Sequence, residues 1–339
     1  MTFDGKNKRK RAIVLTAVDD YIKSAQPITS GMLLSHFEDI SSATIRNELN
    51  ALESMGYFKQ VHTSGGRIPT ALAYKEYVNA LLENDNLDYN SVKQVISNYE
   101  DRSVSLISTL TTLAKRLSKA TNCPAVLVQH GFQNLVIQNI QIIPLMQKDA
   151  LLLVETNAGI IDDNFPLDPN VERSACKEAS DYLTKNFVGK TIGYLTDNIK
   201  DVCLKTGAQI IEFKSLIDGV ADALLNVIQA KCNVSSENPA KMLDGLSQTE
   251  LDDTKNVFEF LENADNIIDV VKEDNAELNF TIGEEQGKLK GGMMMSAPIM
   301  VNGVPIASLA LVGPKRIDYA NVAAALKFIV TQIDQQKGG

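Results

Sequence analysis

The alternation of apolar and polar positions in the first eighty residues predicts three helices followed by a hairpin. Apolar residues recur at helical spacing from Lys8 to Ser24, and Pro27 ends that pattern because proline cannot continue helical hydrogen bonding. Residues 30–37 can form a short second helix, and Ser41 or Ser42 can cap a third. A three-helix bundle with no role in DNA binding would show the same periodicity.

The third predicted helix separates its apolar and polar residues into opposite sectors. At about 100° per residue, Ile45, Leu49 and Leu52 fall on one side and are expected to face a core. Arginine and asparagine make paired hydrogen bonds to guanine and adenine edges in the major groove. An ordinary amphipathic helix with a solvated face would also fit. The side opposite the core holds small or polar residues, namely Ala43, Arg46, Asn47, Asn50 and Ser54.

A glycine-rich turn follows this helix. Gly56 is expected to end the helix, residues 57–61 to form a strand, and Arg67 to begin the returning strand. The turn between the strands is expected to use positive φ angles at its two glycines and to present hydroxyls and Arg67 to phosphate or the minor groove. Three helices and then a hairpin are the order of a winged helix-turn-helix, whose recognition helix enters the major groove. The turn consists of His62, Thr63, Ser64, Gly65 and Gly66.

Beyond residue 82 the pattern mixes helices and strands, which predicts an α+β protein with more than one domain. Asn302-Gly303 is a strong hairpin signal between two apolar runs. The expected helices span residues 73–82, 90–120, 174–186, 216–230, 250–263 and 319–332. The expected strands span residues 125–129, 135–143, 150–155, 296–301 and 306–312.

Charge is distributed unevenly along the 339 residues. The formal net charge is −9, yet residues 1–82 carry ten Lys and Arg against eight Asp and Glu. A cationic N-terminal part joined to an acidic remainder is expected when one domain contacts phosphate groups. No apolar run reaches the length of a membrane span, and no signal peptide is evident, so we expect a cytoplasmic protein.

The sequence offers no recognisable catalytic or metal-binding constellation. Its four cysteines lie far apart without a CxxC pair, and two Gly-Lys segments lack the first glycine of a phosphate-binding loop. His130 is an isolated candidate for catalysis, although a hydrogen-bonded structural histidine explains it as well. We therefore expect neither an enzyme nor a bound cofactor or metal.

Two regions, one near each end of the chain, resemble the HrcA family of heat-inducible transcription repressors. The N-terminal match covers about residues 8–82 and includes SSATIRNEL, LESMGY and HTSGGRIPT. The C-terminal stretch from FTIGEEQGKLKGG to NVAAALKFI is also similar to the end of that family. The resemblance implies a winged helix at 1–82, a GAF-like α/β domain at 83–173 and 265–339, and an inserted dimerising domain at 174–264.

The resemblance further implies a homodimer that binds double-stranded DNA at an inverted repeat, the CIRCE element, and represses chaperone operons of the groE and dnaK type. Its activity would depend on the GroEL chaperonin. An alternative is a winged-helix regulator controlled by a small ligand in its GAF-like domain. A buried polar cavity in that domain would favour the alternative. The residues expected to contact DNA are Ser42, Thr44, Arg46, Asn47, Asn50, His62, Thr63, Ser64 and Arg67.

Overall fold

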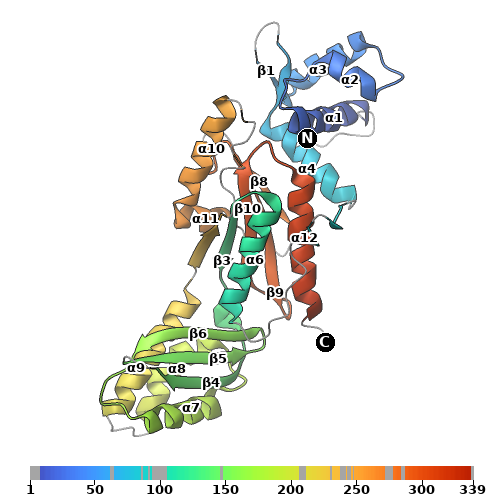
Figure 1. The fold of residues 1–339 in the computed structure, drawn as a ribbon. Helices are drawn as coiled ribbons and strands as arrows, with labels where there is room; N and C mark the ends of the chain where they lie inside the picture. The colour runs from blue at the N-terminus through green and yellow to red at the C-terminus, as the bar shows by residue number, and fades with distance from the viewer. Residues whose placement is uncertain are drawn as a thin grey trace.

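Three groups of elements are stacked along the long axis of the molecule in the computed structural model (Figure 1). An N-terminal group of helices with a two-stranded hairpin lies at one end, a five-stranded sheet with its helices lies in the middle, and a lobe built on a three-stranded sheet lies at the other end. The structure describes residues 8–61, 65–84, 87–90, 92–93, 105–145, 148–205, 211–229, 231–236, 242, 246, 248–271, 278–283 and 287–336.

The N-terminal group contains the predicted helices and hairpin in the predicted order. The first helix has the expected bounds and buries Ile13, Val14, Ala17 and Val18 on one face. The elements are α1 (Lys8–Ser24), α2 (Ser30–Leu33), the 3-10 turn η2 (Leu34–His36), α3 (Ser42–Ser54), β1 (Phe58–Gln60), β2 (Arg67–Pro69) and α4 (Ala71–Asn84).

The middle group is an antiparallel sheet with helices on both faces. Helices α6 (Leu106–Thr121) and α12 (Tyr319–Gln336) cover one face, and α10 (Gln248–Leu261) and α11 (Ala264–Val270) cover the other. Residues 94–104 of the long helix predicted over 90–120 lie outside the described residues. The strand order is β7 (Lys231–Ser235), β3 (Ala125–Gln129), β10 (Val304–Pro314), β9 (Gly292–Val301) and β8 (Asn279–Ile282).

The central strand β10 is buried on both faces. Leu309 and Leu311 belong to the core beneath α6 and α12, whereas Ala310 and Val312 belong to the core beneath α10 and α11. The predicted hairpin between β9 and β10 is confirmed. Asn302 and Gly303 both have positive φ angles, 50° and 78°, as a tight two-residue turn requires.

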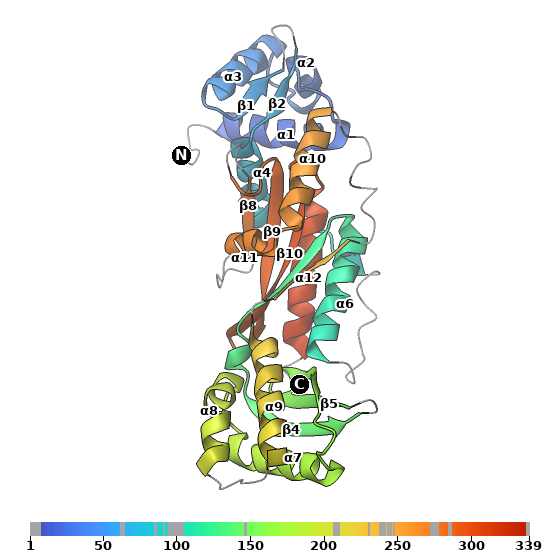
Figure 2. The ribbon, with the colours of Figure 1, turned by 90° about the vertical axis from the view of Figure 1, so that its left-hand side faces the viewer.

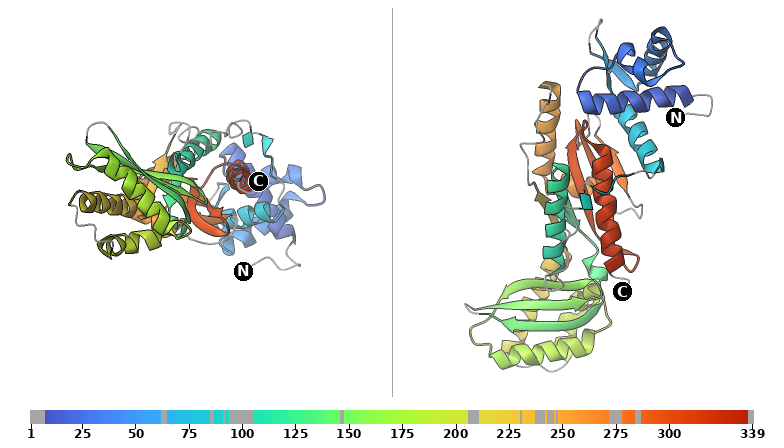
Figure 3. Two further views of the ribbon diagram at one scale, coloured as in Figure 1. Left: turned by 90° about the horizontal axis from the view of Figure 1, so that it is seen from below. Right: turned by 45° about the vertical axis from the view of Figure 1, so that its right-hand side comes forward.

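The lobe has its own antiparallel sheet, in the order β4 (Ile137–Pro144), β5 (Asp149–Thr156) and β6 (Gly159–Pro166). Helices α7 (Arg173–Phe187) and α9 (Ile211–Ile228) pack on one face of it, and α8 (Ile192–Lys205) packs on α9. Figure 3 shows the strands on one side of the lobe and the helices on the other. The short 3-10 turn η3 (Phe132–Asn134) connects this lobe to β3.

The sheet pairing places the domain boundaries differently from the sequence prediction. We expected residues 83–173 to belong to the GAF-like domain, yet β4, β5 and β6 pair only with one another among the described strands. We expected 174–264 to be the insertion, yet β7 pairs with β3, and α10 packs on β9 and β10. The chain therefore leaves the five-stranded sheet after β3 and returns to it at β7.

The outer edge of β4 is occupied by groups from α7 and the turn after it. The Ile140 amide donates to Thr184 Oγ1 at 3.1 Å, and the Ile142 amide donates to Ser180 Oγ at 2.9 Å. Pro144, at the end of β4, has no amide hydrogen to donate. Together with the two hydrogen bonds to α7, this prevents the edge from pairing with a further strand.

None of the described helices is both long enough and apolar enough to cross a membrane.

Candidate nucleic-acid interface

Helix α3 begins where Ser41 caps its N-terminus. The Ser41 hydroxyl accepts a hydrogen bond from the Thr44 amide at 3.2 Å and lies 2.9 Å from the Thr44 hydroxyl. The Ser42 hydroxyl donates to Ser30 Oγ of α2 at 3.2 Å. Ser42 and Thr44, both expected to contact DNA, therefore also hold the start of α3 in place.

The polar face of α3 is exposed, as the sequence predicted. Ile45, Leu49 and Leu52 have no exposed surface and anchor the helix in the core of the N-terminal group. Arg46 and Asn47 have no hydrogen bond or ion pair through their side chains to any described residue. The exposed residues on the opposite side are Ala43, Arg46, Asn47, Asn50 and Ser54.

Helix α3 ends at a glycine, also as predicted. Gly56 has a φ of 84°, and the Tyr57 amide donates to the Leu52 carbonyl at 2.9 Å, which closes the last turn. The Thr70 hydroxyl donates to the Gly56 carbonyl at 2.6 Å. The hairpin thus starts at a fixed angle to the helix.

Arg67 braces the hairpin against α3. Its Nε donates to Glu53 Oε2 at 2.8 Å, and its Nη2 donates to Asn50 Oδ1. Only 12% of its side chain is exposed. A contact between Arg67 and phosphate therefore requires release from Glu53 or Asn50, which the sequence prediction did not include. The sequence alone gave no sign that Arg67 pairs with Glu53.

The hairpin packs closely on the segment between α1 and α2. Ile28 and Arg67 exchange two backbone hydrogen bonds, at 2.8 and 2.9 Å, so this segment extends the β1–β2 pair. A Cβ added to Gly66 would lie 2.6 Å from the Pro27 carbonyl oxygen. Gly66 has no positive φ, so this close approach, and not the predicted turn geometry, requires glycine. His62, Thr63 and Ser64 lie outside the described residues.

The basic N-terminal residues divide between structural and exposed roles. Arg11 binds Glu76 and Glu83 of α4, each at 2.7 Å, and so ties α1 to α4. Lys10 lies 4.0 Å from Glu48. Lys8, Arg9 and Lys59 are exposed and supply positive charge at this end of the molecule.

The histidine and two of the cysteines noted in the sequence have structural environments. No cluster of three or more His, Cys, Asp or Glu side chains among the described residues could hold a metal ion. The Nε2 atom of His130 lies 2.9 Å from Ser308 Oγ, which gives this histidine a structural partner. Cys123 and Cys176 are buried free thiols, and burial raises the pKa of Cys123 to about 12.

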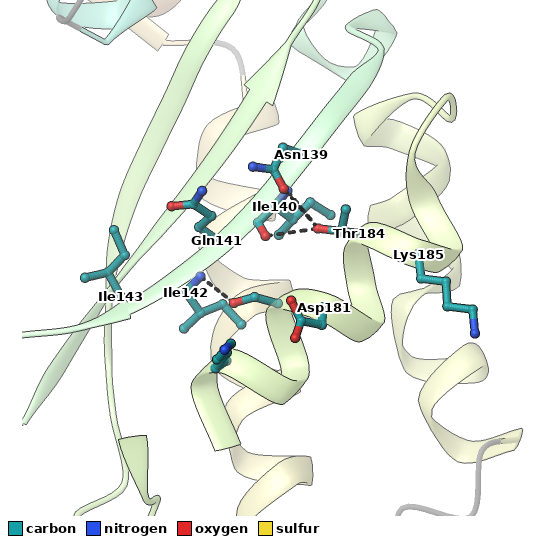
Figure 4. A pocket seen from close by; sticks show the side chains of 10 residues that line it. Asn139, Ile140, Gln141, Ile142, Ile143, Asp181, Thr184 and Lys185 are labelled. Atoms are coloured by element: carbon teal, nitrogen blue, oxygen red, sulfur yellow. Dashed lines mark hydrogen bonds between the residues drawn. The ribbon is translucent and has the colours of Figure 1, made fainter. Parts of the chain in front are cut away.

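A hollow of about 460 Å³, with both polar and apolar side chains in its lining, lies between β4 and α7 (Figure 4). It is lined by Asn139 and Gln141 of β4 and by Lys177, Asp181 and Lys185 of α7. A buried polar cavity in the GAF-like domain, expected at 83–173 and 265–339, would favour the small-ligand alternative. This hollow lies in the lobe, at the far end from α3 (Figure 1).

Comparisons with known proteins match nearly the whole chain. A family model described as HrcA protein C terminal domain matches residues 108–323. The Heat-inducible transcription repressor HrcA of Clostridioides difficile is 30% identical over 347 residues, which cover 97% of this chain and 99% of that protein. The repressor of the same description from Ruminiclostridium cellulolyticum is 26% identical over 344 residues, covering 97% and 96%.

A solved structure shares the fold. It is the crystal structure of a hypothetical protein at 2.2 Å resolution, with a TM-score of 0.64 and 20% sequence identity. The alignment covers 97% of this chain and 98% of that one. The likeness therefore extends across all three groups of elements.

Replacing Gly66 by alanine is expected to destabilise the N-terminal group by about 1–3 kcal/mol, because the new methyl group would overlap the Pro27 carbonyl. Gly31→Ala is the matched control, since its Cβ would meet only Thr29 Oγ1, at 3.8 Å. Urea unfolding of the full chain, followed at the transition of the N-terminal group, measures both. Equal stability of the two variants would contradict the close approach.

Proposed function

Because the chain belongs to the HrcA family of heat-inducible transcription repressors, we propose that it represses heat-shock chaperone operons of the groE and dnaK type at an inverted-repeat CIRCE operator. The family is one of transcription repressors and not of enzymes. The exposed polar face of α3 is the observation that carries the proposal. It combines a rigid apolar anchor with side chains suited to base edges.

In the proposed complex, α3 enters the major groove of double-stranded DNA. Arg46 contacts a guanine edge, Asn47 contacts an adenine edge, and Asn50 offers its amide group beside them. Ser42 and Thr44 at the N-terminus of the helix contact phosphate, as do the hairpin residues His62, Thr63 and Ser64. Arg67 acts mainly as the brace that sets the hairpin angle.

Arg46→Ala is expected to weaken operator binding by about 1–3 kcal/mol and to relax the base preference at one position, because a paired contact to a base edge is lost. Arg67→Ala is expected to weaken binding to all sequences nearly equally, since it disturbs hairpin placement and phosphate contact. Gel-shift titration on operator and scrambled duplexes, at several salt concentrations, measures both effects.

Arg173→Ala is the control, because Arg173 is an exposed arginine on the lobe. It should leave the affinity for operator unchanged. Affinity for operator should fall steeply with salt for all the proteins, since Lys and Arg contacts release counterions. Wild-type binding by the Arg46 variant would refute the assignment of α3 as the recognition helix.

A homodimer is proposed through the open face of the lobe sheet. An inverted repeat requires two readers related by a twofold axis. On the face of the sheet away from α7 and α9, Ile143 is aligned with Leu151, and Leu153 lies two residues along β5. Ile143 is 39% exposed, and its neighbour Leu145 is 40% exposed. An apolar sheet face of this kind suits burial against a second copy.

Ile143→Lys is expected to shift the protein from dimer to monomer, because a lysine ammonium would have to be desolvated at the interface. Leu251→Lys is the matched control. Leu251 is a similarly exposed apolar residue, 38% accessible, but it lies on α10 at the far end of the body. Analytical ultracentrifugation at micromolar concentration distinguishes the two. A dimer unaffected by Ile143→Lys would exclude this face.

We further propose that the GroEL chaperonin maintains the active repressor. The sheet order supports a folding requirement, because β10 pairs with β3 across the entire inserted lobe, and such non-local pairing forms slowly. Repressor refolded with GroEL and ATP is expected to bind operator more fully than repressor refolded alone. The active fraction of each preparation is titrated with operator DNA. Equal active fractions with and without GroEL would refute the proposed role of the chaperonin.

A further inference from the structure

The winged-helix group packs on the body, which is the five-stranded sheet with its helices, through a buried aromatic cluster. Tyr74 and Tyr77 of α4 have ring centroids 5.7 and 6.2 Å from that of Tyr319, at the start of α12. Phe280 of β8 meets the same Tyr319 ring edge-on at 5.7 Å. Tyr74 and Tyr319 are almost fully buried. Burial of these rings holds the two parts together mainly through the hydrophobic effect, which is non-directional.

Arg316 adds a directional contact beside this cluster. Its Nε donates to Glu250 Oε1 of α10 at 2.5 Å, and its Nη1 reaches the Ile22 carbonyl of α1 at 3.5 Å. The side chains of Arg316 and Glu250 are only 13% and 12% exposed. Figure 2 shows α10 reaching up to α1 at this junction. The guanidinium of Arg316 therefore contacts both α1 of the winged-helix group and α10 of the body.

The helix ends favour this arrangement. Ile22 lies in the last turn of α1, where carbonyl groups lack partners within the helix and the helix dipole attracts a cation. Glu250 lies in the first turn of α10, where the dipole favours a carboxylate. Burial, with the Glu250 carboxylate as a further cause, raises the pKa of the adjacent Tyr21 to about 12. The Arg316–Glu250 pair is itself largely buried.

We propose that Arg316 is a positioning residue that fixes the angle of the winged helix on the α/β body, so that the two readers of a dimer are held at the spacing of their half-sites. This inference rests on the proposed function. The planar guanidinium suits the role because it presents several donors in fixed directions, whereas lysine would offer a single point charge. Separation of the winged-helix group would break the contact from Arg316 to the Ile22 carbonyl, while the ion pair with Glu250 would stay within the body.

The test compares Arg316→Ala with wild type on three DNA duplexes: a single half-site, the inverted repeat, and a repeat with its spacer altered by two base pairs. Half-site affinity should be unchanged, because the face of α3 is intact. Affinity for the inverted repeat should fall by about tenfold or more, since the second contact loses effective concentration. Discrimination between the two spacers should shrink.

Lys288→Ala provides the control, because Lys288 forms an exposed ion pair with Asp269 elsewhere on the body. It should behave as wild type on all three duplexes. Glu250→Gln tests the same junction if Arg316→Ala does not fold, since it removes the charge and keeps an acceptor. Equal losses on half-site and repeat would overturn the positioning role, as would unchanged binding to the repeat.

Hydrogen exchange of the full-length protein without DNA separates this inference from the proposed function. Arg316→Ala should speed exchange severalfold in the segments 19–26 and 315–322 and leave α3 unchanged. Unchanged exchange at the junction would contradict the positioning role of Arg316. If wild-type protein fails to bind the inverted repeat, the proposed operator function is wrong, and the exchange result still decides whether Arg316 joins the two parts.

Discussion

The burial of β10 is the constraint on which the rest of the structure depends. Residues 306–314 are all buried, and the strand is hydrogen-bonded to β3 on one edge and β9 on the other. Its two partners lie on either side of the inserted lobe in the sequence. The end of the same strand delivers Arg316 and Tyr319 to the base of the winged helix. The core sheet and the N-terminal group are therefore joined through one strand.

Helix α3 could be predicted from sequence because its evidence is local. Helical periodicity alone placed Ile45, Leu49 and Leu52 in the core, and the structure gives each of them no exposed surface. The cap at Ser41 and the stop at Gly56 were equally local signals. The exposed Arg46 and Asn47 follow directly, because the sector opposite a buried stripe must face outward.

Features that depend on non-local contacts could not be predicted from the sequence. The alternating pattern of β4, β5 and β6 fits any half-buried sheet, so it could not reveal that these strands pair apart from β3. The β7 strand is polar and lies at a sheet edge, which hides its apolar period. Arg67 looked like a phosphate ligand until its partners Glu53 and Asn50 were placed beside it. Glycine is likewise required at position 66 by the close approach of Pro27, which is remote from the turn in the sequence.

In this arrangement the position of α3 depends on the junction at Arg316, and the junction depends on the buried strand β10. The most direct test is chemical protection of guanine N7 on an inverted-repeat duplex bound by the full-length protein. The account predicts protected guanines in the major groove of both half-sites, on one side of the duplex. Binding that protects no guanine N7, or protects only one half-site at saturation, would contradict a paired α3 reader.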